Sequence, residues 1–341
     1  MLFRSCNLFL LINFSLNKNI KLIINYLLGP LLFVILAWSL YKQIAHQPDL
    51  DVRWQHIKNS WRQFTFWIVF ILMFLNWGIE ARKWQLLIAP LERFSLQKAF
   101  KAVFAGCSIT MLTPNRIGEY GGRIMYVEEQ HRLRAISLTI LGSIRQLAIT
   151  MLMGTAGLVL LKYGNIVPKE TFHSISWLLS NSLFIISMSV TVILLLLYFR
   201  VHFLIIAISR ISFLQKLTRH IIVLDVFSGK QLLRILFLSF FRYMVFILQY
   251  MLLLKVMEVG ISYPVSFLLL TVFYLVMAVA PTIGFTELPV RATASVLLFE
   301  LFSDNIVGIQ AAAFGIWLIN IVLPAVFGSL LIFGIKIMKE R

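Results

Sequence analysis

The chain has 341 residues, 60% of them hydrophobic, and a formal net charge of +17 from 31 basic and 14 acidic residues. Several apolar runs approach or exceed the roughly 18 residues of a membrane span, which predicts an all-α polytopic membrane protein and excludes a sizeable soluble domain. Two cysteines and six scattered histidines exclude a disulfide framework and a zinc site. The positive charge therefore indicates cytoplasmic loops and anionic lipid, with no nucleic-acid partner.

Six apolar runs are predicted to be full membrane spans. In chain order they cover residues 21–41, 64–84, 135–161, 175–199, 235–254 and 311–335. Residues 1–20 are expected to be an interfacial lead-in, and residues 337–341 a cytoplasmic tail. The region 21–336 is therefore predicted to be one transmembrane domain, with one half over 21–161 and the other over 175–336.

Two further apolar runs, 102–112 and 265–279, are too short for a span of about 20 residues and are typical of re-entrant segments. Each leads into a motif in which a proline, a glycine, a glutamate and an arginine occur in that order. We call residues 113–123 the first motif and residues 280–291 the second motif. The motifs lie about half a chain apart, which predicts two inverted-topology halves whose broken helices form a site near the bilayer midplane.

The distribution of lysine and arginine sets the predicted orientation. With six spans, and hairpins that return to the side they enter, most of these residues fall in loops on the N-terminal side. Both termini are therefore predicted to be cytoplasmic. The first motif then enters from the cytoplasm and the second from the opposite side. A hairpin made of two short spanning helices would also return the chain to the side it came from. Re-entrant hairpins and pairs of short spanning helices therefore both remain open.

The charged residues of the motifs are the candidate site for a lipid headgroup. Glu119 with Arg123, and Glu287 with Arg291, have the spacing of helical ion pairs, which on exposed helices are worth only about 0.2–0.5 kcal/mol. At membrane depth a charge costs roughly 2.5–3.5 kcal/mol or more, which favours a function, and arginine binds phosphate through two parallel hydrogen bonds. The candidate headgroup-binding residues are Arg116, Glu119, Arg123, Arg145, Arg242, Glu287 and Arg291.

Structural interpretations stand beside these functional ones. Arg116 anchors the first hairpin to surface lipid or binds the headgroup. Arg145 and Arg242, both in mid-span, pair with a motif glutamate or contact lipid phosphate. The residues predicted to break helices are Pro114, Gly118, Pro281 and Gly284. Hydrogen bonds between helices are expected from Asn76, Gln146, Gln249 and Asn320. An interfacial collar is expected at Glu80, Arg82 and Lys83.

Asp49 and Asp51, in the first outer loop, suggest an alternative function. An acidic pair at this place is similar to that of polyprenyl-phosphate-dependent membrane glycosyltransferases, where it binds a divalent cation. A solvated acidic loop is the simpler explanation, and the sequence shows no catalytic triad, phosphate-binding glycine loop or ATP-binding motif. The chain is therefore expected to be no enzyme and to use no metal or cofactor.

Residues 112–119, Leu-Thr-Pro-Asn-Arg-Ile-Gly-Glu, resemble the lysylphosphatidylglycerol synthase/flippase transmembrane family, and residues 82–87 are similar to it as well. The second motif departs from the family pattern in having fewer glycines. The resemblance spans most of residues 60–335 and implies a flippase-like protein of the bacterial inner membrane. It further implies a phospholipid or polyprenyl-phosphate ligand. Because the sequence ends just after the last predicted span, the aminoacyl-transferase domain that follows the membrane part in some members is expected to be absent. A homodimer and a partner lipid-modifying enzyme both remain open.

Overall fold

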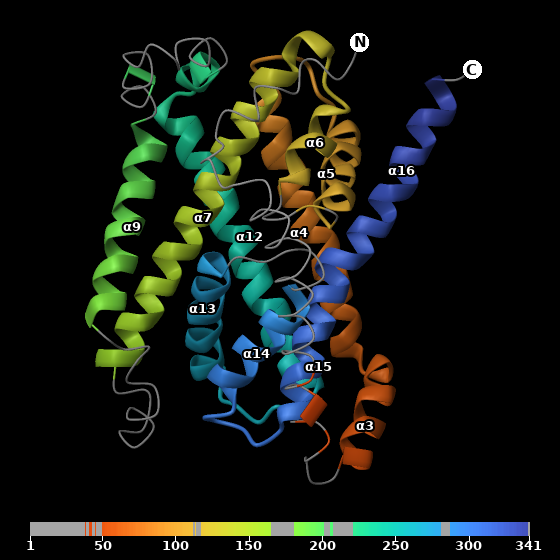
Figure 1. Ribbon diagram of the computed structural model, residues 1–341, viewed down its shortest axis with the longest axis vertical. Coiled ribbons are helices and arrows are strands. Elements are labelled where there is room, and N and C mark those ends of the chain that lie inside the picture. Colours follow the sequence, from red (N-terminus) through yellow and green to blue (C-terminus); the bar gives the residue numbers. More distant parts are fainter. Residues whose placement is uncertain are drawn as a thin grey trace, which may run out of the picture.

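The computed structural model describes residues 38, 41, 42, 45, 50–111, 113, 117–164, 181–200, 205–206, 221–280 and 287–339. These residues form helices joined by turns and short irregular segments, with no strand among them (Figure 1). Several predictions fall outside the described residues. They concern the lead-in 1–20, nearly all of the first span, Asp49, Pro114, Arg116, Pro281 and Gly284.

Four helical segments are long and apolar enough to cross a membrane. They are α4 (Phe64–Ile88), α7 (Arg132–Tyr163), α12 (Gly229–Val256), and the last segment, made of α15 (Ile306–Trp317), η8 (Leu318–Val322) and α16 (Leu323–Lys339). These segments are candidate spans by length and composition, and they coincide with four of the six predicted spans. The fifth run, 175–199, is described over α9 (Asn181–Phe199), in which Phe184–Phe199 is a shorter apolar helix. The chain is a multi-pass membrane protein.

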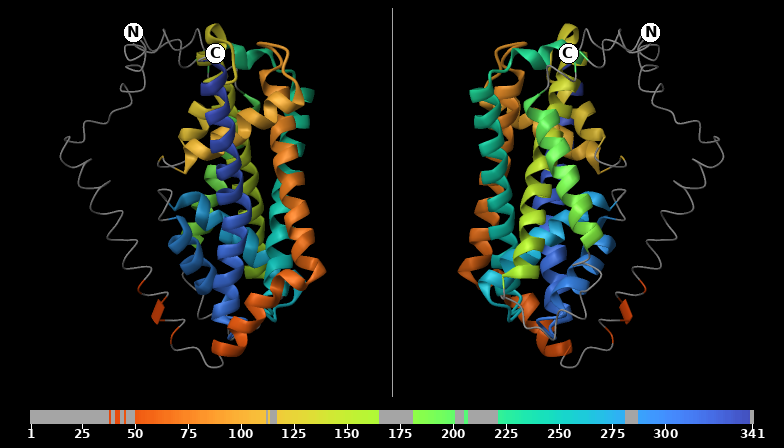
Figure 2. Two further views of the ribbon diagram at one scale, coloured as in Figure 1. Left: turned by 90° about the vertical axis from the view of Figure 1, so that its right-hand side faces the viewer. Right: turned by 90° about the vertical axis from the view of Figure 1, so that its left-hand side faces the viewer.

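The two short apolar runs form two helical hairpins. The first pairs α5 (Leu96–Thr110) with α6 (Gly118–Ile124), and the second pairs α13 (Tyr263–Val279) with α14 (Glu287–Phe299). The α5–α6 hairpin lies toward the end of the bundle where α16 ends, whereas α13 and α14 lie toward the end that carries α3 (Leu50–Asn59) (Figures 1 and 2). The short connecting helices are η3 (Ser60–Arg62), η4 (Glu129–His131) and η6 (Ile222–Val226).

Polar caps explain where several helices begin. The Ser95 side chain accepts a hydrogen bond from the Lys98 amide at the start of α5. Ser228 and Gln231 cap each other's backbone groups at the start of α12 in a capping box. The Asn305 Oδ1 accepts from the Gly308 amide at 2.9 Å at the start of α15. Each cap satisfies amide groups that have no partner inside the helix.

Glycines allow α6 to lie directly against the backbone of α5. A Cβ atom at Gly118 would meet the carbonyl group of Ile109 at 2.4 Å, and one at Gly122 would meet that of Ala105 at 2.4 Å. Gly118 is the first residue of α6, so its contribution at this position is close packing. No described glycine has a positive φ.

The last span contains one widened turn. Residues Leu318–Val322 form the π-helical turn η8, which holds Asn320. Pro324 has no amide hydrogen and cannot donate to the carbonyl four residues earlier, which is that of Asn320. A π turn accommodates such a missing bond within a helix.

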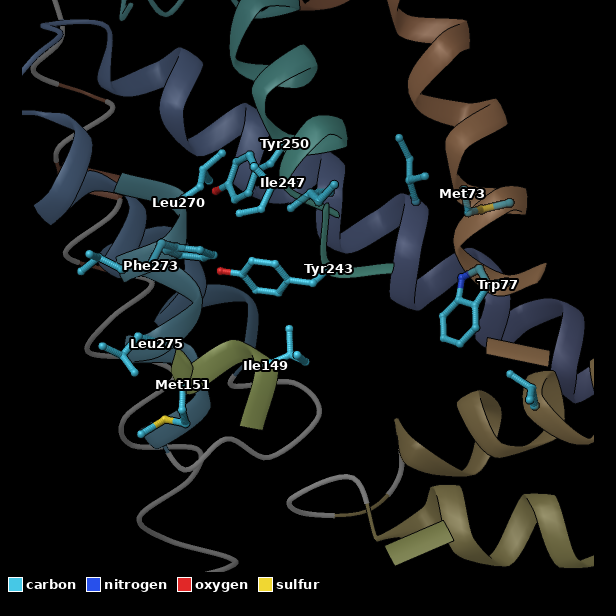
Figure 3. Close-up of a cluster of buried hydrophobic side chains, with 14 of the residues drawn as sticks. Met73, Trp77, Ile149, Met151, Tyr243, Ile247, Tyr250, Leu270, Phe273 and Leu275 are labelled. Atoms are coloured by element: carbon cyan, nitrogen blue, oxygen red, sulfur yellow. The ribbon is translucent and has the colours of Figure 1, made fainter. Parts of the chain in front are cut away.

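The apolar core lies where α12, α13, α7 and α4 meet (Figure 3). The Tyr250 ring packs edge-on against the Phe273 ring at 5.4 Å between centroids. Figure 3 shows Tyr243 pointing from α12 toward the part of α13 that carries Phe273. Below these rings Ile149 and Met151 of α7 complete the contact. This core holds the long helices at fixed separations and so positions the charged side chains they carry.

Candidate functional site

Glu80 is the centre of a buried group of charges that several helices assemble. Its Oε1 accepts a hydrogen bond from Arg123 Nη2 of α6 at 2.7 Å, and its Oε2 accepts one from Lys83 Nζ at 2.8 Å. The Nη1 atom of Arg242, on α12, lies 3.2 Å from the same Oε2. All four residues are at most 8% exposed. A single carboxylate therefore faces three cations.

Glu119 and Gln146 extend this group. Glu119 Oε1 accepts a hydrogen bond from Arg123, so the ion pair expected within the first motif is confirmed. Lys83 Nζ also donates to Gln146 Oε1 of α7 at 3.1 Å. The Glu119 side chain is 24% exposed and is the least buried of these groups. We define the Glu80 cluster as Glu80, Lys83, Glu119, Arg123, Arg145 and Arg242.

Arg242 connects the Glu80 cluster to the last span through two asparagines. Its Nε donates to Asn76 Oδ1 at 2.8 Å, and Asn76 Nδ2 donates to Asn320 Oδ1 at 2.9 Å. Further along α12, Gln249 Nε2 donates to the Val69 carbonyl of α4 at 2.9 Å. Together with Gln146, these contacts confirm the hydrogen bonds between helices that the sequence predicts for its mid-span amides.

Arg145 has an unusual environment near the middle of α7. It is fully buried, and within the described part of the chain none of its three guanidinium nitrogens has a hydrogen-bond partner. Its charge is attracted by Glu80 and repelled by Arg123 and Arg242. A buried charge without a direct partner costs several kcal/mol. Charges retained at this depth of a membrane span mark functional positions.

The second motif forms a separate ion pair. Arg291 Nη2 donates to Glu287 Oε1 at 2.9 Å on α14, as its spacing predicts, and the Arg291 guanidinium lies 5.7 Å from the centre of the Phe273 ring. Between described residues, no hydrogen bond or ion pair joins this pair to the Glu80 cluster. The two motifs thus contribute two charged groups, one in each hairpin.

Aromatic side chains connect the two charged groups. The Arg242 guanidinium lies 5.1 Å from the centre of the Phe246 ring, and Phe246 contacts Tyr274 with their centroids 6.2 Å apart. Tyr274 in turn packs against Phe273 at 5.2 Å, and Phe273 lies beneath Arg291. A ring that faces a cation, as Phe246 faces Arg242 and Phe273 faces Arg291, stabilises the charge in an apolar environment. The rings form a continuous path of contacts from one charged group to the other.

The interfacial collar predicted at the end of the second span is wrong for two of its three residues. Arg82 is exposed, whereas Glu80 and Lys83 are buried at the centre of the cluster. The sequence does contain a signal for this, because Asn76, Glu80 and Lys83 follow an i, i+4, i+7 spacing. That spacing places all three on one face of a helix.

The Glu80 cluster suits an anion rather than a metal ion. Its cations outnumber its carboxylates, and arginine is the residue best suited to bind phosphate. Among the described residues no group of histidine, cysteine and acidic side chains could hold a metal ion. Asp51 is exposed in the first turn of α3.

Comparison with known proteins identifies the family. A family model described as the lysylphosphatidylglycerol synthase TM region matches residues 23–328, which include every residue of the Glu80 cluster and both motifs. No curated protein and no solved structure matches the chain. The resemblance seen at residues 112–119 is confirmed over nearly the whole chain. This protein belongs to the lysylphosphatidylglycerol synthase transmembrane-region family.

Proposed function

We propose that this protein binds the phosphate of a lipid headgroup at the Glu80 cluster and carries the lipid across the bacterial inner membrane, without catalysing a reaction itself. The observation that carries the proposal is Arg145, whose buried guanidinium has no hydrogen-bond partner among the described residues. A phosphate oxygen pair would supply the acceptors that this guanidinium lacks. Family membership, in a group connected with lipid synthesis or flipping, supports a lipid as the ligand.

Charge supports the same assignment. Lys83, Arg123, Arg145 and Arg242 carry four positive charges, and Glu80 and Glu119 carry two negative ones. An anion that enters the cluster balances this excess and removes the cost of burying it. A lipid phosphate delivers such an anion into the membrane while its acyl chains stay in the surrounding hydrocarbon.

The two hairpins supply a route for alternating access. The α5–α6 hairpin carries Glu119, the most exposed member of the cluster, and α13–α14 carries the Glu287–Arg291 pair toward the opposite end of the bundle. Movement of one hairpin against the long helices would open the cluster to one side of the membrane. In inverted-repeat transporters, such rocking of one half against the other exposes a central site alternately.

A translocation assay in proteoliposomes tests the proposal. Fluorescent phospholipids with different headgroups are followed across the bilayer for the wild type, Arg145→Met and the exposed-site control Arg82→Gln. We expect Arg145→Met to fold with unchanged or higher thermal stability, because it removes a buried charge without a direct partner. We also expect it to lose translocation, and Arg82→Gln to keep it. Wild-type translocation by Arg145→Met would refute the proposal.

A further inference from the structure

We infer that the ligand of the Glu80 cluster is a lipid phosphomonoester, in which the phosphate ends the headgroup, and that Lys83 determines this choice. The inference rests on the proposed function and specifies its substrate class. It starts from the unequal charges of the cluster, from Arg145, whose guanidinium has no hydrogen-bond partner among the described residues, and from the contacts that surround Lys83.

The Glu80 cluster carries an excess of two positive charges. Its four cations and two carboxylates come from four helices, and the ion pair of the second motif, Glu287 with Arg291, is neutral in sum. Glu80 already accepts hydrogen bonds from Lys83 and Arg123. The amides that reach the cluster, Asn76 and Gln146, carry no charge. A ligand must therefore bring about two negative charges for the occupied cluster to be neutral.

Lipid phosphates differ in the charge they bring. A phosphomonoester carries about −1.5 to −2 at neutral pH, because its second pKa is near 6. A phosphodiester carries a single negative charge, and an amine on its headgroup cancels that charge. A diester would therefore leave one positive charge of the cluster unbalanced, and a headgroup with an amine would leave more. Unbalanced charge in a buried site weakens binding strongly.

Lys83 is the cation whose charge sets this balance. Its ammonium group is a compact positive charge, which glutamine removes and arginine keeps. Lys83 Nζ lies 2.8 Å from Glu80 Oε2 and 3.1 Å from Gln146 Oε1. The other charged groups around it are Arg145 on α7, Arg242 on α12, and Arg123 with Glu119 on α6. Removing the Lys83 charge lowers the excess to one, which matches a phosphodiester.

The test compares two lipids with identical acyl chains in the same proteoliposomes at pH 6.5, where the monoester stays mostly doubly charged. The probes are fluorescent dioleoyl phosphatidic acid, a phosphomonoester, and fluorescent dioleoyl phosphatidylmethanol, a phosphodiester without an amine. Binding and translocation are measured for the wild type, Lys83→Gln, Lys83→Arg and the exposed neighbour Arg82→Gln. Inorganic phosphate is added separately at millimolar concentration, to separate a lipid site from a site for free phosphate.

We expect the wild type to bind the monoester about tenfold or more tightly than the diester, since one buried charge exceeds the ~1.4 kcal/mol that tenfold represents. Lys83→Gln should lose or invert this ratio, whereas Lys83→Arg and Arg82→Gln should keep it. If Lys83→Gln does not fold, the ratios of monoester to diester binding in the wild type and in Lys83→Arg still test the inference.

Equal binding of both lipids by the wild type, or an unchanged ratio in folded Lys83→Gln, would overturn the inference while leaving lipid translocation intact. Inorganic phosphate that competes as effectively as the lipid monoester would also overturn it. Failure of both lipids to bind or move would instead remove the proposed function itself. The two failures are therefore distinguishable.

Discussion

Glu80 combines a structural task with a functional one at the scale of a single residue. Its two oxygens face Arg123, Lys83 and Arg242, which belong to three different helices. Removing one partner of a buried ion pair typically destabilises a protein by about 3–5 kcal/mol, because the remaining charge stays buried without compensation. Loss of the Glu80 carboxylate would remove the counter-charge of three buried cations at once.

The first prediction concerns Glu80→Gln. We expect a loss of about 3–5 kcal/mol in the free energy of unfolding, because the amide does not neutralise the surrounding cations. The exposed neighbour Arg82→Gln should change it by about 0.5 kcal/mol or less. Chemical denaturation in detergent measures both values. Equal stability of Glu80→Gln and the wild type would show that the carboxylate is not the counter-charge of the cluster.

The second prediction concerns the two asparagines that link the cluster to the last span. Asn76 both accepts from Arg242 and donates to Asn320, whereas Asn320 accepts that bond and donates to the Ile316 carbonyl. Leaving a buried partner unsatisfied costs about 1–3 kcal/mol, and more where the partner is charged. Asn76→Leu should therefore destabilise the protein more than Asn320→Leu does. Thermal unfolding of the two variants provides the comparison, and the reverse order would contradict it.

At the scale of elements, the α5–α6 hairpin depends on contact between backbones. Gly118 and Gly122 lie on the face of α6 toward α5, while Gly121 has open space around its Cβ position. The hairpin is therefore held by close packing on one face, and it presents Arg123 to Glu80 from a fixed distance.

The third prediction uses this difference between neighbouring glycines. In Gly122→Ala, the added methyl group would lie 2.4 Å from the Ala105 carbonyl, which forces the two helices apart. Such overpacking costs about 1–3 kcal/mol or more. Gly121→Ala adds the same methyl group in open space and should be neutral or stabilising by up to about 1 kcal/mol. Melting temperatures that shift equally in both variants would exclude a role for the close approach.

The elements were largely predictable from the sequence, while the composition of the site was not. Run lengths alone distinguish the full spans from the two hairpins, and the i, i+4 spacing predicts the pairs Glu119–Arg123 and Glu287–Arg291. Glu80 and Lys83 were misplaced because charges beside Trp84 at the end of an apolar run are typical of an interface. Only the packing of α5, α7 and α12 against α4 shows that this part of the helix is buried.

At the scale of the whole molecule, the described helices have two distinct ends. The exposed residues of α3 lie at one end, and the start of α12 with the end of α16 lies at the other (Figure 1). Lysine and arginine counts in the loops favour the second end as cytoplasmic. With this orientation, the opening that we propose for the α5–α6 hairpin would face the cytoplasm.

The fourth prediction tests that orientation. Single cysteines replace the exposed residues Lys58 and Lys230 in a background without Cys6 and Cys107. A membrane-impermeant maleimide added to intact cells should label the cysteine at 58 and not the one at 230, because the two lie at opposite ends of the bundle. Labelling in opened membranes provides the control for reactivity. Labelling of the cysteine at 230 from outside would reverse the orientation.

The contact between α16 and α5 has a mechanical consequence. A Cβ atom at Gly328 would lie 1.8 Å from the Phe104 carbonyl oxygen, so the two backbones touch and α16 belongs to one rigid body with the first hairpin. A displacement of that hairpin would carry α16 with it, and the π turn, which Pro324 follows, lies directly before α16. That turn holds Asn320, which the Asn76 amide and the Arg242 guanidinium connect to Glu80. Bending of the last span at this turn would therefore pull on the charged cluster through the Asn320 amide.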